Sequence, residues 1–342
     1  MTRKRPISSS YLASPPAIAV MVAVVLAIAP FAGLPVFYVQ QAFTLFFFVA
    51  LAQSWNILGG YTGYLSLGHA AFVGMGGYAV AILYFHFGWS PFLTFPVAAV
   101  AAGLLALIIG AVCFRIRGSY FLIATMLVLF ILQSLMVNLR DLTNGANGID
   151  LPLFTFDFTL EARIWYYCGL ALVILITAIA FAIERSKFGL NLMAIREDED
   201  VARTMGVRTV HCKAAAFIIS AALAGVLGAA DAYHAHIVEP FGAFNLELSA
   251  APILMAILGG TRTWIGPILG AVIFHTISTT LTLVVGNEYT TVAFSLFLMI
   301  VVLLLPEGLI GLFRRARLRP GDPQPNVDTV QDPPKGLRQA SR

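Results

Sequence analysis

The segment at residues 195–206 combines acids, bases and a glycine in an order that predicts a short helix with both ends marked. Six of these twelve residues are charged, although charged residues make up only 11% of the chain. Acids favour the first turn of a helix, a base favours its last turn, and glycine favours the left-handed cap. In chain order these residues are Asp198, Glu199, Asp200, Arg203 and Gly206.

The apolar residues of this expected helix fall on one face. They are Val201, Ala202 and Met205, at positions i, i+1 and i+4. An apolar face ringed by charges is a docking surface for another protein. The alternative is a helix that lies on the membrane surface without a partner.

Catalytic chemistry has little support elsewhere in the sequence. The phosphate-binding pattern G-x-x-x-x-G-K-[ST] is absent, so an ATP-driven role needs a partner protein. Cys113, Cys168 and Cys212 lie on different predicted spans or faces and indicate neither a disulfide nor a metal site. His69, which follows Gly68, is expected to be a hydrogen-bonded packing residue, not a proton relay. We therefore expect no catalytic residue, metal or cofactor in this chain.

The composition of the chain indicates an integral membrane protein. Of the 342 residues, 59% are hydrophobic and 11% are charged, against about 25% charged in soluble proteins. No segment shows the alternation of an outer-membrane barrel. We expect an all-α fold with about ten transmembrane helices, because runs near the ~20 apolar residues needed to cross a bilayer occur ten times. They lie at 17–33, 35–55, 65–87, 91–113, 119–138, 164–184, 214–234, 246–258, 264–285 and 291–312.

Basic residues predict the orientation and the domain limits. Lys and Arg accumulate in cytoplasmic loops, and ten spans place the basic clusters on one side, so both termini of this multi-pass chain are expected in the cytoplasm. We divide the chain into a cytoplasmic N-terminus at 1–16, a transmembrane domain at 17–313 and a disordered basic tail at 314–342. The N-terminus reads as an uncleaved first span, with a cleaved signal as the alternative. The tail should meet anionic lipid rather than nucleic acid.

The charged segment at 185–213 must lie in water. It carries ten charges, and at about 3 kcal/mol each their insertion into the bilayer centre would cost on the order of 30 kcal/mol. The expected short helix therefore lies in the loop between the sixth and seventh spans.

Glycines concentrate at 54–83, and Ile-Leu-Gly-Gly occurs at both 57–60 and 257–260. We expect Gly59 and Gly60 to break their helix, which is tolerated at membrane depth only inside protein or beside a watery cavity. Small residues also let membrane helices pack closely. Two interpretations, a translocation path or helix packing, therefore stay open for Asn56, Gly59, Gly60, Gly68, His69, Gly259 and Gly260.

The longest loop expected on the opposite side is 139–163. Its turn formers include Thr143, Gly145, Asn147 and Gly148. Five further polar residues are expected at the same side and could form a polar vestibule or hydrated loop ends. They are Asp231, His234, His236, Glu239 and Glu247.

Several motifs resemble those of one transporter family. Residues 200–206, Asp-Val-Ala-x-x-x-Gly, are similar to the E-A-A-x-x-x-G loop by which ABC importer permeases engage their ATPase subunits, with Asp for Glu and Val for Ala. The stretch FGLNLMAIREDED at 188–200 resembles branched-chain amino-acid ABC transporter permeases of the M type. Further matches are SWNILGGYTGYLSLGHAAFVGMGGYAVAIL at 54–83, TNGANGI at 143–149 and LMAILGGTRTWIGPILGA at 254–271.

The resemblance implies an ABC importer permease that pairs with a second homologous permease, two ATP-binding subunits carrying the ATP and Mg, and an extracytoplasmic binding protein. It implies a coupling helix that docks on the ATPase through Glu199, Asp200, Val201, Ala202, Arg203, Met205 and Gly206. It also implies that the loop with Thr143, Gly145, Asn147 and Gly148 faces the binding protein.

Three alternatives remain open at this point. Permeases for urea or short amides have similar loops. A stand-alone secondary transporter would need an ion-coupling residue inside the membrane, and His275 is the main ionisable residue inside a predicted span. A passive channel is the third alternative.

Overall fold

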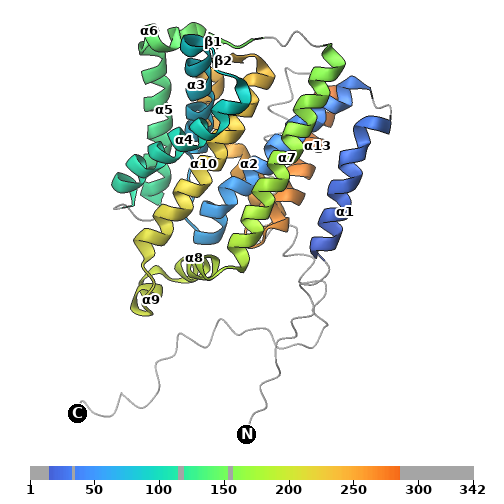
Figure 1. The fold of residues 1–342 in the computed structure, drawn as a ribbon. Helices are drawn as coiled ribbons and strands as arrows, with labels where there is room; N and C mark the ends of the chain where they lie inside the picture. The colour runs from blue at the N-terminus through green and yellow to red at the C-terminus, as the bar shows by residue number, and fades with distance from the viewer. Residues whose placement is uncertain (1–14, 33–34, 115–118, 153–156, 286–342) are drawn as a thin grey trace, which may run out of the picture.

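The computed structural model describes residues 15–32, 35–114, 119–152 and 157–285. These residues form a helical bundle with one two-residue strand pair (Figure 1). The long helices are α1 (Pro15–Ile28), α2 (Val36–Thr62), α3 (His69–Phe87), α4 (Pro91–Cys113), α5 (Ser119–Asn138), α7 (Phe158–Arg185), α10 (Thr209–Ala235), α12 (Leu246–Gly259) and α13 (Ile265–Val285). The short elements are η2 (Ala29–Ala32), α6 (Arg140–Thr143), η3 (Gly145–Asn147), β1 (Ile149–Asp150), α8 (Lys187–Glu197), α9 (Glu199–Thr204), β2 (Ile237–Val238) and α11 (Pro240–Ala243).

Eight helices among the described residues are long and apolar enough to cross a bilayer. The predicted span at 246–258 is one of them, because α11 and α12 together form an apolar stretch at Pro240–Gly259. The first predicted span corresponds to α1 and η2, whose apolar part, Met21–Phe31, is shorter than the other eight. The last predicted span, at 291–312, and the tail at 314–342 lie outside the described residues, as do residues 1–14. The all-α membrane fold is confirmed.

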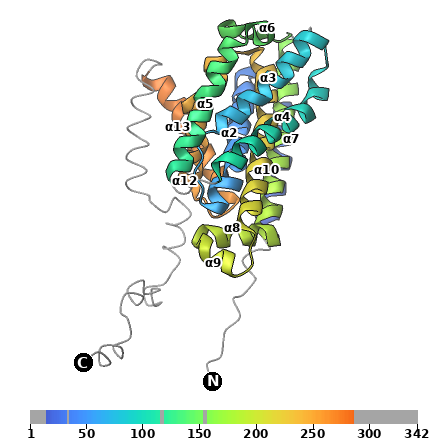
Figure 2. The same ribbon diagram turned by 90° about the vertical axis from the view of Figure 1, so that its left-hand side faces the viewer.

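The bundle has two different ends (Figures 1 and 2). The helices α8 and α9 lie across one end, and β1, β2 and α6 lie at the other. We call these the α8–α9 end and the strand end. The strands pair antiparallel, with Ile149 opposite Val238 and Asp150 opposite Ile237.

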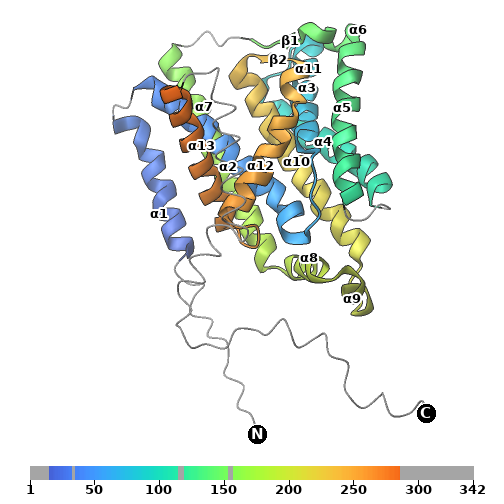
Figure 3. The same ribbon diagram turned by 180° about the vertical axis from the view of Figure 1, so that it is seen from behind.

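Helix α2 is the centre of the bundle. Every residue from Val49 to Thr62 is buried, as expected of a helix that is surrounded by protein on all sides. It packs against α7, α10, α12 and α13, and the last two lie beside it on one flank (Figure 3). Large apolar side chains on the outer helices point outward instead, including Leu93, Ile108 and Tyr120. This arrangement suits a bundle whose solvent is lipid.

Glycines bring several backbones into contact. A Cβ atom at Gly76 in α3 would lie 2.0 Å from the carbonyl oxygen of Gly225 in α10. A Cβ at Gly259 in α12 would lie 1.7 Å from the oxygen of Gly266 in α13. Both contacts exclude any side chain, so these glycines serve helix packing.

The expected helix break at Gly59 and Gly60 is wrong. Helix α2 continues through both residues and ends at Gly63, whose φ is 76°. At Gly60 a Cβ would lie 2.6 Å from the backbone oxygen of Thr261. Gly60 is therefore required by the close approach of the Thr261 backbone, and the helix around it is regular.

We predict that Gly76→Ala lowers the stability of the bundle. The added methyl group must displace the α10 backbone, which overpacks the contact and costs about 1–3 kcal/mol. The thermal unfolding midpoint in detergent measures the effect. The matched control is Gly103→Ala in α4, where the nearest atom to a new Cβ is 3.6 Å away. Equal midpoints for the two variants would contradict the contact.

Candidate functional site

The charged segment folds as two short helices joined at Asp198. The Ser186 side chain caps α8 by accepting a hydrogen bond from the amide of Gly189 at 3.1 Å. Asp198 ends α8 and caps α9, because its carboxylate accepts from the amides of Asp200 and Val201, both at 2.9 Å. Gly206 follows α9 with a φ of 88°. The predicted short helix, with its acidic start and left-handed glycine, is confirmed.

The exposed face of α9 differs in part from the expected docking face. Val201 is 57% exposed and Met205 is 80% exposed. Ala202 is only 3% exposed, so it faces this chain's own core and presents nothing to a partner. Arg203 and Asp200 flank the exposed pair and lie within 4.0 Å of each other.

Glu199 also points inward, toward a buried lysine. Its carboxylate lies 2.7 Å from the ammonium of Lys213 in α10, and Lys213 is 1% exposed. The hydroxyl of Tyr64 accepts from Lys213 at 3.0 Å and donates to Glu199, and the ammonium lies 4.3 Å from the centre of the Tyr64 ring. We call these three residues the lysine anchor. They join α9, α10 and the segment after α2.

The lysine anchor changes the acidity of Glu199. Burial by itself would raise the pKa of this carboxyl, but the hydrogen bonds from Lys213 and Tyr64 and the nearby ammonium outweigh it and lower the pKa below its ordinary 4.5. Glu199 is therefore ionised near neutral pH. Its role is to hold α9 in place, which differs from the expected role as a docking residue.

A second polar cluster closes the α8–α9 end around α2. The guanidinium of Arg196 donates to the carbonyl oxygen of Gly60 and, at 3.0 Å, to the hydroxyl of Thr261. The amide of Gln53 donates to the oxygen of Trp264 at 2.5 Å. Asn56 donates to the oxygen of Thr263 at 3.4 Å. These contacts tie α2 and α8 to residues 261–264, the turn between α12 and α13.

The residues with two open interpretations lie in packed surroundings. Asn56, Gly59 and Gly60 border the turn between α12 and α13, while Gly259 and Gly260 begin it. His69 is 1% exposed, and its Nε2 lies 2.9 Å from the hydroxyl of Ser54, as expected for a packing residue. A Cβ at Gly68 would lie 2.9 Å from the oxygen of Thr125. Their described contacts favour helix packing.

Three of the four loop residues expected to face a binding protein are buried. Thr143 donates to the oxygens of Met136 and Leu139 at 2.6 and 2.8 Å, which folds the turn back onto α5. Thr143, Gly145 and Gly148 are buried, and Asn147 is exposed. Only Asn147 of the four could touch another protein, together with its exposed neighbours.

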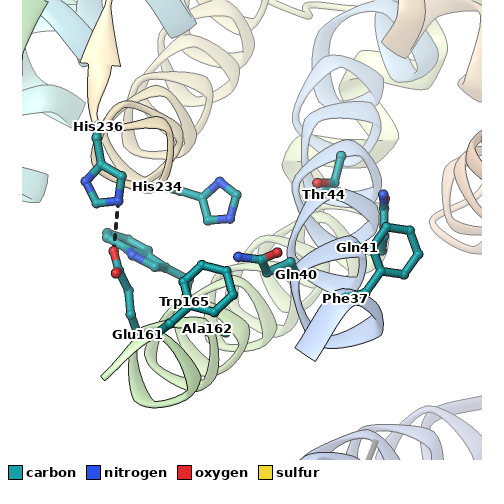
Figure 4. A pocket seen from close by; sticks show the side chains of 10 residues that line it. Phe37, Gln40, Gln41, Thr44, Glu161, Ala162, Trp165, His234 and His236 are labelled. Atoms are coloured by element: carbon teal, nitrogen blue, oxygen red, sulfur yellow. Dashed lines mark ion pairs between the residues drawn. The ribbon is translucent and has the colours of Figure 1, made fainter. Parts of the chain in front are cut away.

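A cavity of about 280 Å³ opens at the strand end between α2, α7 and the end of α10 (Figure 4). Polar side chains on its wall are Gln40, Gln41, Thr44, Glu161, His234 and His236. Of the five residues expected to form a vestibule there, only the two histidines line the cavity. Asp231, Glu239 and Glu247 do not line this cavity, so the five residues do not form one vestibule there.

Sequence reasoning missed the other residues of the cavity and the anchor. Gln40, Gln41 and Thr44 lie inside an apolar run, where three neighbouring polar residues were the available signal. Glu161 lies just before a predicted span, and Lys213 was counted only as a loop charge. Its position one residue before an apolar run was the available signal that Lys213 needs an acidic partner.

Comparisons with known proteins agree with the geometry. The family model described as branched-chain amino acid transport system / permease component matches residues 36–303. The high-affinity branched-chain amino acid transport system permease protein LivM of Escherichia coli (strain K12) is 28% identical over 300 residues, covering 78% of this chain and 68% of the relative. The corresponding LivH protein of the same organism is 27% identical over 188 residues, covering 51% of this chain and 59% of the relative. No solved structure matches the chain.

We predict that Lys213→Met destabilises the fold in a pH-dependent way. Removing one partner of a fully buried pair costs about 3–5 kcal/mol, and we expect a smaller cost here because Glu199 is only partly buried. In the wild type, the stability due to the lowered pKa of Glu199 is present near neutral pH and is lost as the pH falls below 4.5. In the variant, burial of Glu199 is uncompensated, so protonation on acidification relieves the penalty.

The gap in unfolding midpoint between wild type and Lys213→Met should therefore be largest near about pH 7 and should narrow toward about pH 4. Arg208→Met is the matched control, since Arg208 is exposed, and it should leave the midpoint nearly unchanged. A gap that is independent of pH would show that the anchor is not ionic.

Proposed function

The chain belongs to the family of branched-chain amino acid transport permeases and is the membrane-spanning permease subunit of an ABC importer; on this premise we propose that it moves branched-chain amino acids into the cytoplasm by alternating access. The match of the family model to residues 36–303 carries the proposal, because it spans the described bundle from α2 onward. The relatives' names favour this substrate over urea or short amides.

We propose that α9 is the coupling helix on which an ATP-binding subunit docks. Its exposed apolar residues, Val201 and Met205, would enter a cleft on that subunit, and Arg203 would meet an acidic rim. The lysine anchor makes this surface rigid, so a displacement of α9 would be passed to α10 through Lys213 and to the end of α2 through Tyr64. ATP and Mg would be bound by the partner subunits, and this chain would carry no cofactor.

The remaining partners follow from the two ends of the bundle. Relatives of both the LivM and the LivH type support pairing with a second homologous permease. We place the α8–α9 end and both termini in the cytoplasm of a bacterial inner membrane, because residues 185–213 carry ten charges and six of them are Lys or Arg. A substrate-loaded binding protein would then approach the strand end. No nucleic-acid partner is proposed.

We predict that Met205→Asp abolishes co-purification of the ATP-binding subunits. The new carboxylate would be buried unpaired in the interface, at a cost of several kcal/mol, enough to separate the subunits at ordinary concentrations. Because Met205 is 80% exposed, the change leaves the chain's own core intact. Pull-down of the permease from detergent extracts measures the loss.

Met205→Leu is the control, since it keeps an apolar side chain and should retain the partner. The unfolding midpoint of the isolated permease should be the same for both variants. Retention of the ATP-binding subunits by Met205→Asp, with transport at the wild-type rate, would rule out α9 as the coupling helix.

A further inference from the structure

The cavity at the strand end has six polar side chains on its wall, and only some of them are engaged within the bundle. Gln40, Gln41 and Thr44 occupy the first turns of α2, which is otherwise apolar at that level. No hydrogen bond joins the side chains of Gln40 and Thr44, or the ring of His234, to another described residue. Polar groups that are removed from water need hydrogen-bond partners. A polar solute bound in the cavity would supply them.

The polar groups differ in kind around the cavity. Glu161 in α7 provides a carboxylate, and its Oε1 lies 2.8 Å from Nε2 of His236. Nδ1 of His236 lies 3.2 Å from the carbonyl oxygen of Pro152, which fixes the ring and thereby the carboxylate. His236 itself holds a left-handed conformation with a φ of 59°, directly after α10.

His234 is held by aromatic rings and not by hydrogen bonds. Its ring stacks on Phe43 at 4.1 Å between centres and meets Trp165 edge-on at 6.2 Å. Figure 4 shows the amide of Gln40 pointing from α2 toward the side of the cavity where Trp165 and His234 lie. One side of the cavity therefore offers a carboxylate, the other offers N–H donors, and Phe37 and Phe158 add apolar surface.

We propose that this cavity is a binding site for a single free amino acid, which rests on the proposed function and assigns the substrate a place within this chain. The α-ammonium group would pair with Glu161, and the α-carboxylate would accept hydrogen bonds from His234 and Gln40. The branched side chain would lie against Phe37 and Phe158. The volume of about 280 Å³ lies just below the roughly 300–1,000 Å³ of sites for drug-sized ligands, which suits one amino acid.

Protection of an introduced thiol tests this site without relying on transport. The complete transporter is prepared with Cys113, Cys168 and Cys212 replaced by Ser and with Thr44→Cys, in vesicles of phosphatidylcholine and phosphatidylglycerol. A membrane-impermeant thiol reagent added from the strand side should label residue 44. Leucine at about ten times its Kd should slow labelling by about tenfold.

Two analogues and two variants identify the groups involved. Leucinamide, which lacks the carboxylate, and 4-methylpentanoate, which lacks the ammonium group, should protect much less than leucine. Glu161→Gln should remove protection by leucine, while Glu247→Gln should retain it, because Glu247 is an exposed acid at the same end. A cysteine placed at Glu247 should label at the same rate with and without leucine.

Uptake of leucine with ATP and the binding protein is measured in the same vesicles. Normal uptake without protection at residue 44 would overturn the binding site and leave the proposed function standing. Protection without uptake of any branched-chain amino acid would count against the proposed function only. Loss of labelling on adding phosphatidylethanolamine, with no effect of leucine, would assign the cavity to a lipid headgroup and overturn the proposal.

Discussion

A cation buried near the start of a membrane-spanning helix must be paired, and the arrangement of the α8–α9 end depends on the partners of Lys213. Its acid comes from α9 and its hydroxyl partner from the residue after the α2 cap. A buried ion pair adds little net stability over an apolar packing, but a single unpaired charge is costly. The three segments are therefore held in one relative orientation. This orientation also fixes where the exposed side chains of α9 lie.

Glycines supply the second half of this rigidity. Because lipid is as apolar as leucine, membrane helices gain little by hiding apolar surface from it and depend on close packing and hydrogen bonds. Gly60 and Gly259 let backbones approach until the turn between α12 and α13 reaches α2, and Arg196 then bonds across that contact. The contacts that tie α2, α8 and the turn between α12 and α13 are thus concentrated at the α8–α9 end, while the cavity lined by Gln40, Glu161 and His234 opens at the strand end.

The sequence could predict features that depend on neighbouring residues, such as the ends of a helix. It could not predict which side chains face the protein core and which face outward. The ends of α9 are set by residues within a few positions of each other, so Gly206 was identified correctly, and Asp198, expected in the first turn, lies one position earlier as the cap. A helix of six residues has no periodicity long enough to show which side faces the protein, so Ala202 and Glu199 were expected on the wrong side. Gly59 and Gly60 were expected to break the helix, because the sequence of a glycine pair does not show whether it bends a helix or permits a close contact with another backbone. The strand pair is two residues long on each side and leaves no alternating pattern to detect.

The pairing of β1 with β2 has a consequence for biogenesis. Chains are made from the N-terminus onward, so Ile149 leaves the ribosome before α7, α8, α9 and α10 exist, while its partner Val238 follows all four. Contacts between distant segments form after local ones, because the loop between them must first be closed. The turn after α5 therefore has no strand partner until α10 has been inserted. Only then can His236 complete the wall of the cavity. A nascent permease truncated before His236 would therefore have the helices from α2 to α10 but an incomplete cavity wall.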